Sequence, residues 1–181
     1  MAACHYRLFD TALGACGLAW SDAGLTQVRL PDHSEALTRA NLLARQPQAE
    51  HCPVGGPLFV AVAMEQIKAH LNGSPHHLRE LPLDWSGVRG FELRVYVAAR
   101  ALDPGQTCTY GEMANAIGDP AAMRAVGQAL GHNPWPLVVP CHRVLAAGGR
   151  LGGFSAPGGT DTKRRLLVLE AGMVRREGQL F

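Results

Sequence analysis

The sequence predicts an α/β protein in two parts, a small three-stranded antiparallel sheet with helices followed by a helical domain. Apolar residues alternate with polar ones three times in the first third of the chain, as in half-buried strands. The second half instead carries apolar residues at helical spacing, interrupted by glycine and proline. The pattern changes near residues 75–90, and we place the two domains at residues 1–85 and 86–181.

The composition is that of an ordinary globular protein. The chain has 181 residues, of which 47% are hydrophobic and 18% charged, so it can bury a core without the support of disulfide bonds or structural metal ions. A net charge of +2 does not by itself identify a nucleic-acid binder. Basic residues nevertheless crowd the end of the chain: Lys163, Arg164, Arg165, Arg175 and Arg176.

The cysteines and the apolar runs bear on the compartment. Five widely spaced cysteines, at positions 4, 16, 52, 108 and 141, argue against a disulfide framework or a zinc ribbon and favour a reducing compartment. The sequence has no signal-peptide pattern and no apolar run approaching the roughly 20 residues that span a bilayer. We therefore expect a cytoplasmic protein without a membrane partner.

The expected elements of the first half follow in order. Strands are expected around residues 6–8, 18–20 and 26–30, separated by glycines. Ser34 is a suitable cap for a helix over residues 34–45, and residues 46–57 have the composition of a loop. A second helix runs from Phe59 to Leu71 and ends at Asn72-Gly73. Residues 81–85 alternate again, which predicts a short extended segment.

The second half is predicted to be mainly helical. A helix over residues 91–102 stops at Asp103-Pro104-Gly105, and Thr109 caps a helix over 110–117. A further helix over 121–131 follows a break at residues 118–120, and this pair favours a helix-turn-helix whose second member is the recognition helix. A glycine-rich loop over 146–159 precedes a last helix, capped by Thr160 or Asp161, with Leu166, Leu169 and Met173 on one face.

Residues 133–144, Asn-Pro-Trp-Pro-Leu-Val-Val-Pro-Cys-His-Arg-Val, place a thiol beside two nitrogen bases. The prolines make this segment stiff and non-helical, with a strand-like stretch at 137–139. A neighbouring base or cation raises the reactive thiolate fraction. Adjacent side chains on an extended segment point opposite ways, so contact between Cys141 and His142 requires a turn or a bridging water. The alternative is a buried, unreactive cysteine.

Other candidate residues have two interpretations each. Arg124 is the only charge on the presumed recognition helix, and it either contacts nucleic acid or is a solvated arginine. The small residues around it, including Ala125, either allow close approach to a groove or pack within the protein. Glu170 either orients a histidine that activates the thiol or is an exposed helix glutamate. Tyr110 is either a core aromatic or a phenolic donor.

Taken together, these motifs resemble the O6-alkylguanine-DNA alkyltransferase family, the methylated-DNA–protein-cysteine methyltransferases. The resemblance rests on Pro140-Cys141-His142-Arg143-Val144, with residues 133–136 and 124–127 before it. It covers residues 88–175 and extends more loosely over the first 80, and segments 104–106, 109–111 and 153–155 fall in family order. It implies a ribonuclease-H-like N-terminal domain and a winged helix-turn-helix-like core in the C-terminal domain.

The function implied by this resemblance is suicide DNA repair. The protein would be a monomer that binds double-stranded DNA by the minor groove, either singly or cooperatively, without a cofactor or a metal. It would flip O6-alkylguanine, or O4-alkylthymine, into a pocket, because the target oxygen cannot be reached within the base stack. The alkyl group would then pass irreversibly to Cys141, so that each molecule acts once.

The resemblance also assigns roles to the reacting groups and the residues that hold them. Cys141 would be the nucleophile and alkyl acceptor, His142 the base acting through a water, and Glu170 the group that orients His142. Asn133 would hold the turn that presents the thiol. Arg124 would fill the gap that the flipped base leaves in the stack, as wedging side chains do elsewhere.

Further residues are implied to contact the DNA and the flipped base. Tyr110 would meet the guanine and help to rotate its 3′ phosphate, and Ala125 would lie on the DNA-binding face. The Ser155 N–H would donate to O6, and the Val144 carbonyl would accept from the exocyclic amine. The pocket would be lined by Leu130, Pro136 and Phe154.

The sequence departs from the family pattern in three places. Phe154 stands where many relatives have tyrosine, which removes a hydroxyl contact to the base. The loop Ser155-Ala156-Pro157-Gly158-Gly159 is longer than the Ser-Gly-Gly of relatives and so changes the pocket rim. Some relatives bind zinc near the N-terminus, where Cys4 is suitably placed. Trp20 and Thr26 occupy the positions of other ligands, so we expect no metal.

Three other classes of protein fit parts of the sequence. An alkyltransferase-like protein that marks lesions without chemistry would replace Cys141, commonly by tryptophan. A redox-sensing helix-turn-helix regulator would bind a specific operator, which the weakly polar recognition helix argues against. A Cys–His hydrolase would need an oxyanion hole, and the sequence indicates none.

Overall fold

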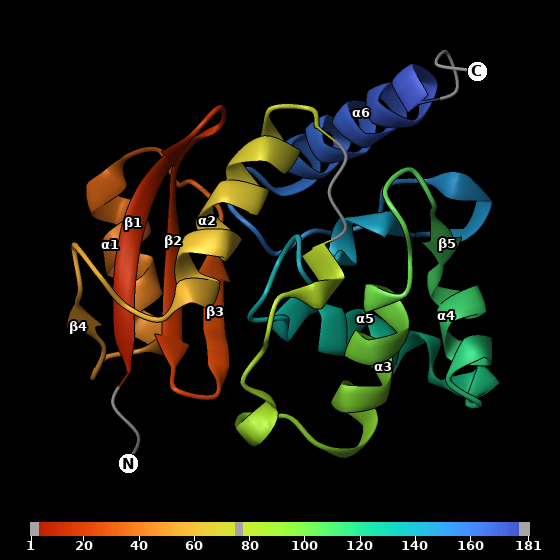
Figure 1. Ribbon diagram of the computed structural model, residues 1–181. Helices are drawn as coiled ribbons and strands as arrows, with labels where there is room; N and C mark the ends of the chain where they lie inside the picture. The colour runs from red at the N-terminus through yellow and green to blue at the C-terminus, as the bar shows by residue number, and fades with distance from the viewer. Residues whose placement is uncertain (1–3, 75–77, 178–181) are drawn as a thin grey trace.

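The computed structural model describes residues 4–74 and 78–177, with side chains described as far as residue 174. It is a mixed α/β fold in which a sheet with two helices lies beside a mainly helical half (Figure 1). The strands are β1 (His5–Thr11), β2 (Gly14–Ser21), β3 (Gly24–Arg29), β4 (Glu50–His51), β5 (Cys108–Thr109) and β6 (Val144–Leu145). The α-helices are α1 (Glu35–Arg45), α2 (Leu58–Leu71), α3 (Gly90–Arg100), α4 (Tyr110–Ala116), α5 (Met123–His132) and α6 (Gly159–Glu177).

The N-terminal sheet has the strand order β3-β2-β1-β4 within residues 4–74. Strands β1, β2 and β3 are antiparallel neighbours, as predicted. The expected three strands are nevertheless wrong by one, because β4 pairs parallel to β1 inside the segment predicted as a loop. The Glu50 N–H donates to the Cys4 carbonyl and the Cys52 N–H to that of Tyr6. A strand of two residues is too short to show an alternating pattern.

Helices α1 and α2 cover opposite faces of this sheet (Figure 1). A Cβ added at Gly17 would lie 2.6 Å from Leu42 of α1, so glycine permits the close approach of that helix. On the other face Leu18 and Trp20 of β2 belong to the same buried cluster as Ile67 of α2. Alternate side chains of β2 are therefore buried on opposite faces of the sheet, one set against α1 and the other against α2.

Most predicted helix ends are confirmed. The Ser34 hydroxyl accepts from the Leu37 N–H at 3.2 Å, and Thr109 forms a capping box with Glu112. Gly73, after the end of α2, has a φ of 85° that favours glycine. The cap of α6 was predicted too late, because the helix begins at Gly159 and residues 160–161 lie in its first turn.

The extended segment predicted for residues 81–85 is confirmed in part, around Leu83. Leu83 forms a single parallel bridge with Leu25, and Trp85 then begins a 3₁₀ turn, Trp85–Gly87. Other short 3₁₀ turns lie at Leu78–Glu80, Pro120–Ala122, Cys141–Arg143 and Ala147–Gly149. Within the described residues, no helix is both long and apolar enough to cross a membrane.

The two halves share one buried hydrophobic cluster, which extends from Phe9 in the sheet to Leu166 in α6. Trp135 lies at the junction, where its indole N–H donates to the Leu25 carbonyl at 2.7 Å. The Val28 N–H donates to the Pro134 carbonyl at 2.8 Å. The segment that precedes Cys141 is therefore attached directly to strand β3.

Candidate active site

The segment before the cysteine is a closed turn, and its predicted strand-like stretch at 137–139 is wrong. Leu137 has a φ of 74°, which no strand residue adopts. The Asn133 side chain closes the turn by accepting from the Trp135 N–H at 2.9 Å and donating to the Val139 carbonyl at 2.8 Å. Its Nδ2 also lies 3.3 Å from Cys141 Sγ. One buried amide thus fixes both the turn and the thiol.

An Asn133→Ala variant is expected to lower the free energy of unfolding by about 1–3 kcal/mol, the cost of leaving buried polar groups unpaired. The groups affected are the Trp135 N–H and the Val139 carbonyl. Urea unfolding measures the change, and Asn115→Ala, at an exposed site on α4, is the matched control. Equal stability of the two variants would contradict the role of Asn133 in holding this turn.

Cys141 begins the 3₁₀ turn Cys141–Arg143 and its side chain is buried. This turn is the local bend that contact with the neighbouring histidine was expected to require. Burial raises the pKa of the thiol, and the Asn133 amide and the Lys163 charge only partly oppose this shift. The resting group is therefore a neutral thiol, and its proton must leave when the sulfur attacks.

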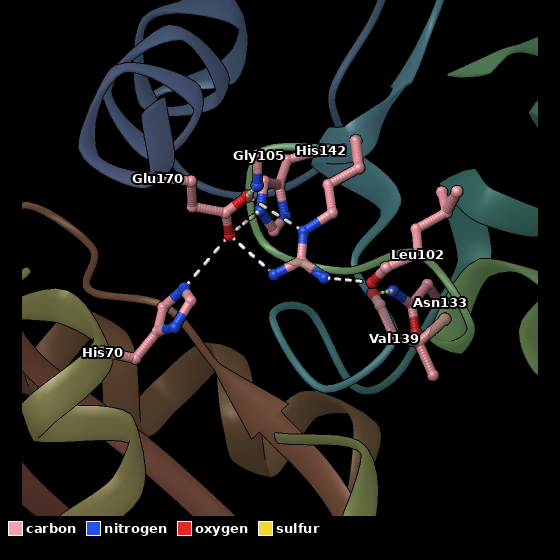
Figure 2. Close-up of polar contacts among 8 residues, drawn as sticks. His70, Leu102, Gly105, Asn133, Val139, His142 and Glu170 are labelled. Carbon is pink, nitrogen blue, oxygen red and sulfur yellow. Dashed lines mark hydrogen bonds and ion pairs between the residues drawn. The ribbon is translucent and has the colours of Figure 1, made fainter. Parts of the chain in front are cut away.

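Behind the turn, Glu170 of α6 is fully buried and collects donors from several elements (Figure 2). Its Oε1 lies 2.8 Å from His142 Nε2 and 3.1 Å from His70 Nε2. The Arg143 guanidinium donates to Oε1 at 2.7 Å and to Oε2 at 2.9 Å. The Gly105 N–H lies 3.3 Å from Oε2. The interpretation of Glu170 as an exposed helix residue is therefore wrong.

These donors determine the charge state of the network. Burial by itself raises the pKa of the Glu170 carboxyl, but hydrogen bonds from His142, His70 and Arg143 outweigh it and hold that pKa well below its usual range. An ionised carboxylate only accepts hydrogen bonds, so each histidine donates its Nε2–H to it. This assigns the proton of His142 to Nε2.

The other ring nitrogen of His142 is then free to act as a base. His142 Nδ1 is buried and has no hydrogen-bond partner among the described residues. Burial lowers the pKa of His142 despite the opposing attraction of Glu170, so the ring is neutral at physiological pH. A neutral imidazole with an unpaired Nδ1 can accept a proton from a neighbouring thiol or water.

A cavity of about 310 Å³ opens in front of the thiol. It gathers Cys141 with four of the predicted substrate residues, which come from α4, α5 and the glycine-rich loop. The lining residues are Tyr110, Gly127, Leu130, Gly131, Cys141, Gly153, Phe154 and Ser155. Four of the six predicted substrate residues therefore meet at the sulfur, although they are far apart in the sequence.

Two predicted substrate residues lie outside this lining. Pro136 instead borders a neighbouring cavity of about 30 Å³, which it shares with Cys141 and Ser155. Val144 is buried, and its carbonyl accepts from Lys163 Nζ at 2.7 Å. A carbonyl oxygen has two lone pairs, so the Val144 oxygen keeps one acceptor site for a second donor.

Lys163 is a functional candidate that the sequence reasoning missed. It was counted with the basic residues at the chain end, but its side chain is buried, with Nζ 5.9 Å from the Tyr110 ring centroid. Its charge favours the thiolate of Cys141. The signal was its spacing, because Lys163 shares the buried face of α6 with Leu166 and Glu170. Arg164 and Arg165 are exposed, and the side chains of residues 175–176 lie outside those described.

His70 was also missed. It lies on α2 in the first half of the chain and is fully buried. Spacing again held the signal, because Ala63, Ile67 and His70 follow one another on the buried face of the helix. A histidine on an otherwise apolar stripe needs a buried partner, and that partner is Glu170.

Of the predicted DNA-binding residues, Arg124 and Ala125 lie on α5, whereas Tyr110 begins α4 and lines the cavity. Arg124 is exposed in the first turn of α5, and Ala125 is half-buried. Helices α4 and α5 pack against each other, and an added Cβ at Gly127 would lie 3.9 Å from the Tyr110 ring. A Cβ at this position would be in ordinary van der Waals contact with the ring, so the gap between Gly127 and Tyr110 is no larger than a methyl group.

Together these features combine a cysteine thiol, a histidine–carboxylate pair behind the sulfur and an open cavity before it, the arrangement used by proteins that react through a nucleophilic cysteine. The sequence model described as 6-O-methylguanine DNA methyltransferase, DNA binding domain, matches residues 90–172. The chain is 39% identical over 166 residues to a methylated-DNA–protein-cysteine methyltransferase of Mycolicibacterium paratuberculosis, covering 92% of each chain. The protein belongs to the methylated-DNA–protein-cysteine methyltransferase family, as its motifs indicated.

Solved structures support the same assignment. The Mycobacterium tuberculosis OGT in complex with DNA matches with a TM-score of 0.71 and 37% identity, covering 93% of this chain and 94% of that one. The O6-methylguanine-DNA methyltransferase of Pyrococcus kodakaraensis matches with a TM-score of 0.62 and 25% identity, covering 92% of this chain and 98% of that one. The fold and the sequence therefore lead to one family.

Proposed function

We propose that this protein is a suicide DNA repair protein that transfers the alkyl group of O6-alkylguanine, and of O4-alkylthymine, to Cys141 Sγ. The observation that carries the proposal is the position of this thiol, between the cavity and the buried His142–Glu170 pair. The family relatives named as methylated-DNA–protein-cysteine methyltransferases support the same reaction. The acceptor is part of the protein, so each molecule reacts once.

The transfer step follows from the protonation states. A water between the thiol and His142 Nδ1 carries the Cys141 proton to the imidazole, and Glu170 stabilises the imidazolium that forms. The sulfur bonds to the alkyl carbon while the bond between that carbon and O6 breaks, and the electron pair of the broken bond remains on O6. The guanine anion takes up the proton that the imidazolium gives back, so His142 returns to its neutral form, and the thioether stays on the protein.

The cavity residues would hold the base for this attack. The Ser155 N–H donates to O6, where negative charge develops, and the Val144 carbonyl accepts from the exocyclic amine. Leu130 and Phe154 line the cavity around the base, and Pro136 borders the small cavity next to it. Burial raises the pKa of the Tyr110 hydroxyl, which therefore remains a neutral donor beside the base.

The Cys141 thiol lies in the wall of the cavity. A damaged base in duplex DNA must therefore leave the base stack and enter the cavity to reach the sulfur. Helices α4 and α5 form a helix-turn-helix that binds the minor groove, where small side chains such as Ala125 permit close approach. Arg124 is exposed on α5 and enters the space that the base vacates. Tyr110 turns the 3′ phosphate. A relative solved in complex with DNA supports DNA binding.

In this proposal the groups that react and bind DNA lie in the second half of the chain. Residues 1–85 are a ribonuclease-H-like domain, and residues 86–181 contain a winged helix-turn-helix-like core with the alkyl acceptor. The cavity and α5 both belong to the second half. A single copy thus carries the complete set of reacting groups, in keeping with action as a monomer.

The test is the mass of the protein after incubation with a duplex that contains one O6-methylguanine. We expect one methyl group per protein molecule, located by peptide mapping on Cys141 and on none of the other cysteines. A Cys141→Ala variant should take up none, and an undamaged duplex of the same sequence is the control. Methylation of the Cys141→Ala variant would refute the assignment.

A further inference from the structure

His70 joins the two halves of the molecule at the carboxylate behind the thiol. It comes from α2, one hundred residues before Glu170, and its Nε2 lies 3.1 Å from Glu170 Oε1. Both side chains are fully buried. Figure 2 shows the His70 ring directed from its own side of the site toward Glu170, which His142 approaches from elsewhere.

The carboxylate oxygen that binds His142 is also the one that binds His70. Among the described residues, Glu170 Oε1 receives donors from His142, His70 and Arg143. A carboxylate oxygen has about two lone-pair sites, so three donors share its electron density. Any change in one of these hydrogen bonds alters the strength of the other two.

We propose that His70 is a positioning residue for alkyl transfer, through which α2 fixes the orientation and the basicity of His142. This inference rests on the proposed function, because it takes His142 as the base. The path has two hydrogen bonds: His70 donates to Glu170, and Glu170 accepts the Nε2–H of His142. Nδ1 of His142 is thereby kept free to take the proton of the thiol.

A purely structural role for His70 would not require an imidazole. The neighbouring buried positions of α2, Val60, Ala63, Ile67 and Leu71, are all apolar and already attach the helix to the core. An apolar side chain of similar size would continue that stripe. Burying a polar ring there costs free energy unless the ring is hydrogen-bonded, and the hydrogen bond of His70 is made with the carboxylate that also binds His142.

The charges around His142 give the direction of the expected effect. Glu170 of α6 favours the protonated form of the His142 ring. Arg143, on the same 3₁₀ turn as His142, and His70, on α2, oppose that form. Cys141, which precedes His142 in the chain, is a neutral thiol at rest. Without the His70 donor, Glu170 would attract the His142 proton more strongly and so raise the pKa of His142. The neutral ring needed to accept a proton would then form only at higher pH.

The experiment compares His70→Phe, which removes the donor, with His70→Gln, which keeps an N–H at similar reach. The single-turnover rate with free O6-benzylguanine is measured as a function of pH, so that DNA binding plays no part. We expect His70→Phe to react about tenfold more slowly at neutral pH, the lower end of what loss of a supporting partner costs. The fall of its rate on the acid side of the pH profile, the acid limb, should lie at higher pH than in the wild type. His70→Gln should recover both the rate and the position of the acid limb.

Ile67→Val, one turn earlier on α2, is the matched control, because it opens a small cavity in the same helix face without touching Glu170. The inference is overturned if His70→Phe keeps the wild-type rate and acid limb, or if folded His70→Gln reacts as poorly as His70→Phe. It is also overturned if Ile67→Val reproduces the loss. A wild-type protein that fails to react overturns the proposed function itself.

A measurement on the unmodified protein covers the case in which His70→Phe does not fold. Nitrogen-15 NMR of the histidine rings distinguishes the two tautomers directly. We expect both His70 and His142 to carry their proton on Nε2, since each donates to Glu170. An Nδ1–H tautomer of His70 would overturn the inference, because its Nε2 could then donate nothing to the carboxylate.

Discussion

A Glu170→Gln variant is expected to lose most alkyl transfer and about 3–5 kcal/mol of its free energy of unfolding, the usual cost of breaking a buried ion pair. The neutral amide leaves the buried Arg143 guanidinium without its counter-charge. It also brings an N–H donor to a point where His142, His70 and Arg143 already donate. His142 therefore loses both its orientation and the charge that stabilises its protonated form.

Two measurements separate these effects. Urea unfolding gives the stability, and the single-turnover rate with O6-benzylguanine at low temperature gives the chemistry of the folded fraction. Glu65→Gln is the matched control, because Glu65 makes an exposed ion pair with Lys68 that contributes at most about 1 kcal/mol. If Glu170→Gln were as stable and as fast as Glu65→Gln, the buried network would have no part in folding or reaction.

The same carboxylate gives the protein an acid limit to its stability. The pKa of Glu170 is lower in the folded state than the roughly 4.3 of an unfolded glutamate. Its contribution is therefore complete above that unfolded value and is lost as the pH falls below it toward the folded pKa. The wild-type protein should lose stability from about pH 4 downward, and Glu170→Gln should show a shallower loss over the same range.

Local signals predicted much of the fold, whereas long-range contacts determined where the predictions failed. Ser34 and Thr109 cap helices through hydrogen bonds to residues three positions away, so the sequence alone contains the information. The turn at residues 137–139 depends on the Asn133 side chain and on a tryptophan anchored to β3. Strand β4 depends on the partner strand β1.

Within the site, the cysteine motif was recognisable and its supporting residues were partly so. Glu170 was weighed as an exposed residue, although its spacing from Leu166 and Met173 places it on the buried face of α6. Lys163 and His70 were missed for the same reason, because each is a polar residue on an apolar stripe and finds its partner far away in sequence. A buried polar position can be predicted from periodicity, but the identity of its partner requires the tertiary structure.

Replacing Arg124 by alanine should separate DNA repair from alkyl transfer. We expect a loss of about 100-fold or more with a duplex that contains O6-methylguanine, because a wedging side chain offsets a few kcal/mol of unstacking. The rate with free O6-benzylguanine should stay within about threefold of the wild type, because that base needs no opening of a duplex. Arg124 is exposed and does not line the cavity, so its loss leaves the thiol and its base in place.

The salt dependence of duplex binding distinguishes a wedge from a phosphate contact. Loss of one phosphate contact lowers the slope of log affinity against log salt by about 0.9, whereas loss of a side chain that fills the stack leaves the slope nearly unchanged. Lys68→Ala on α2 is the control, since it removes one exposed positive charge from the sheet half. Equal losses of Arg124→Ala on duplex and free base would refute the wedge, and a slope lowered by a full contact would reassign Arg124 to a phosphate.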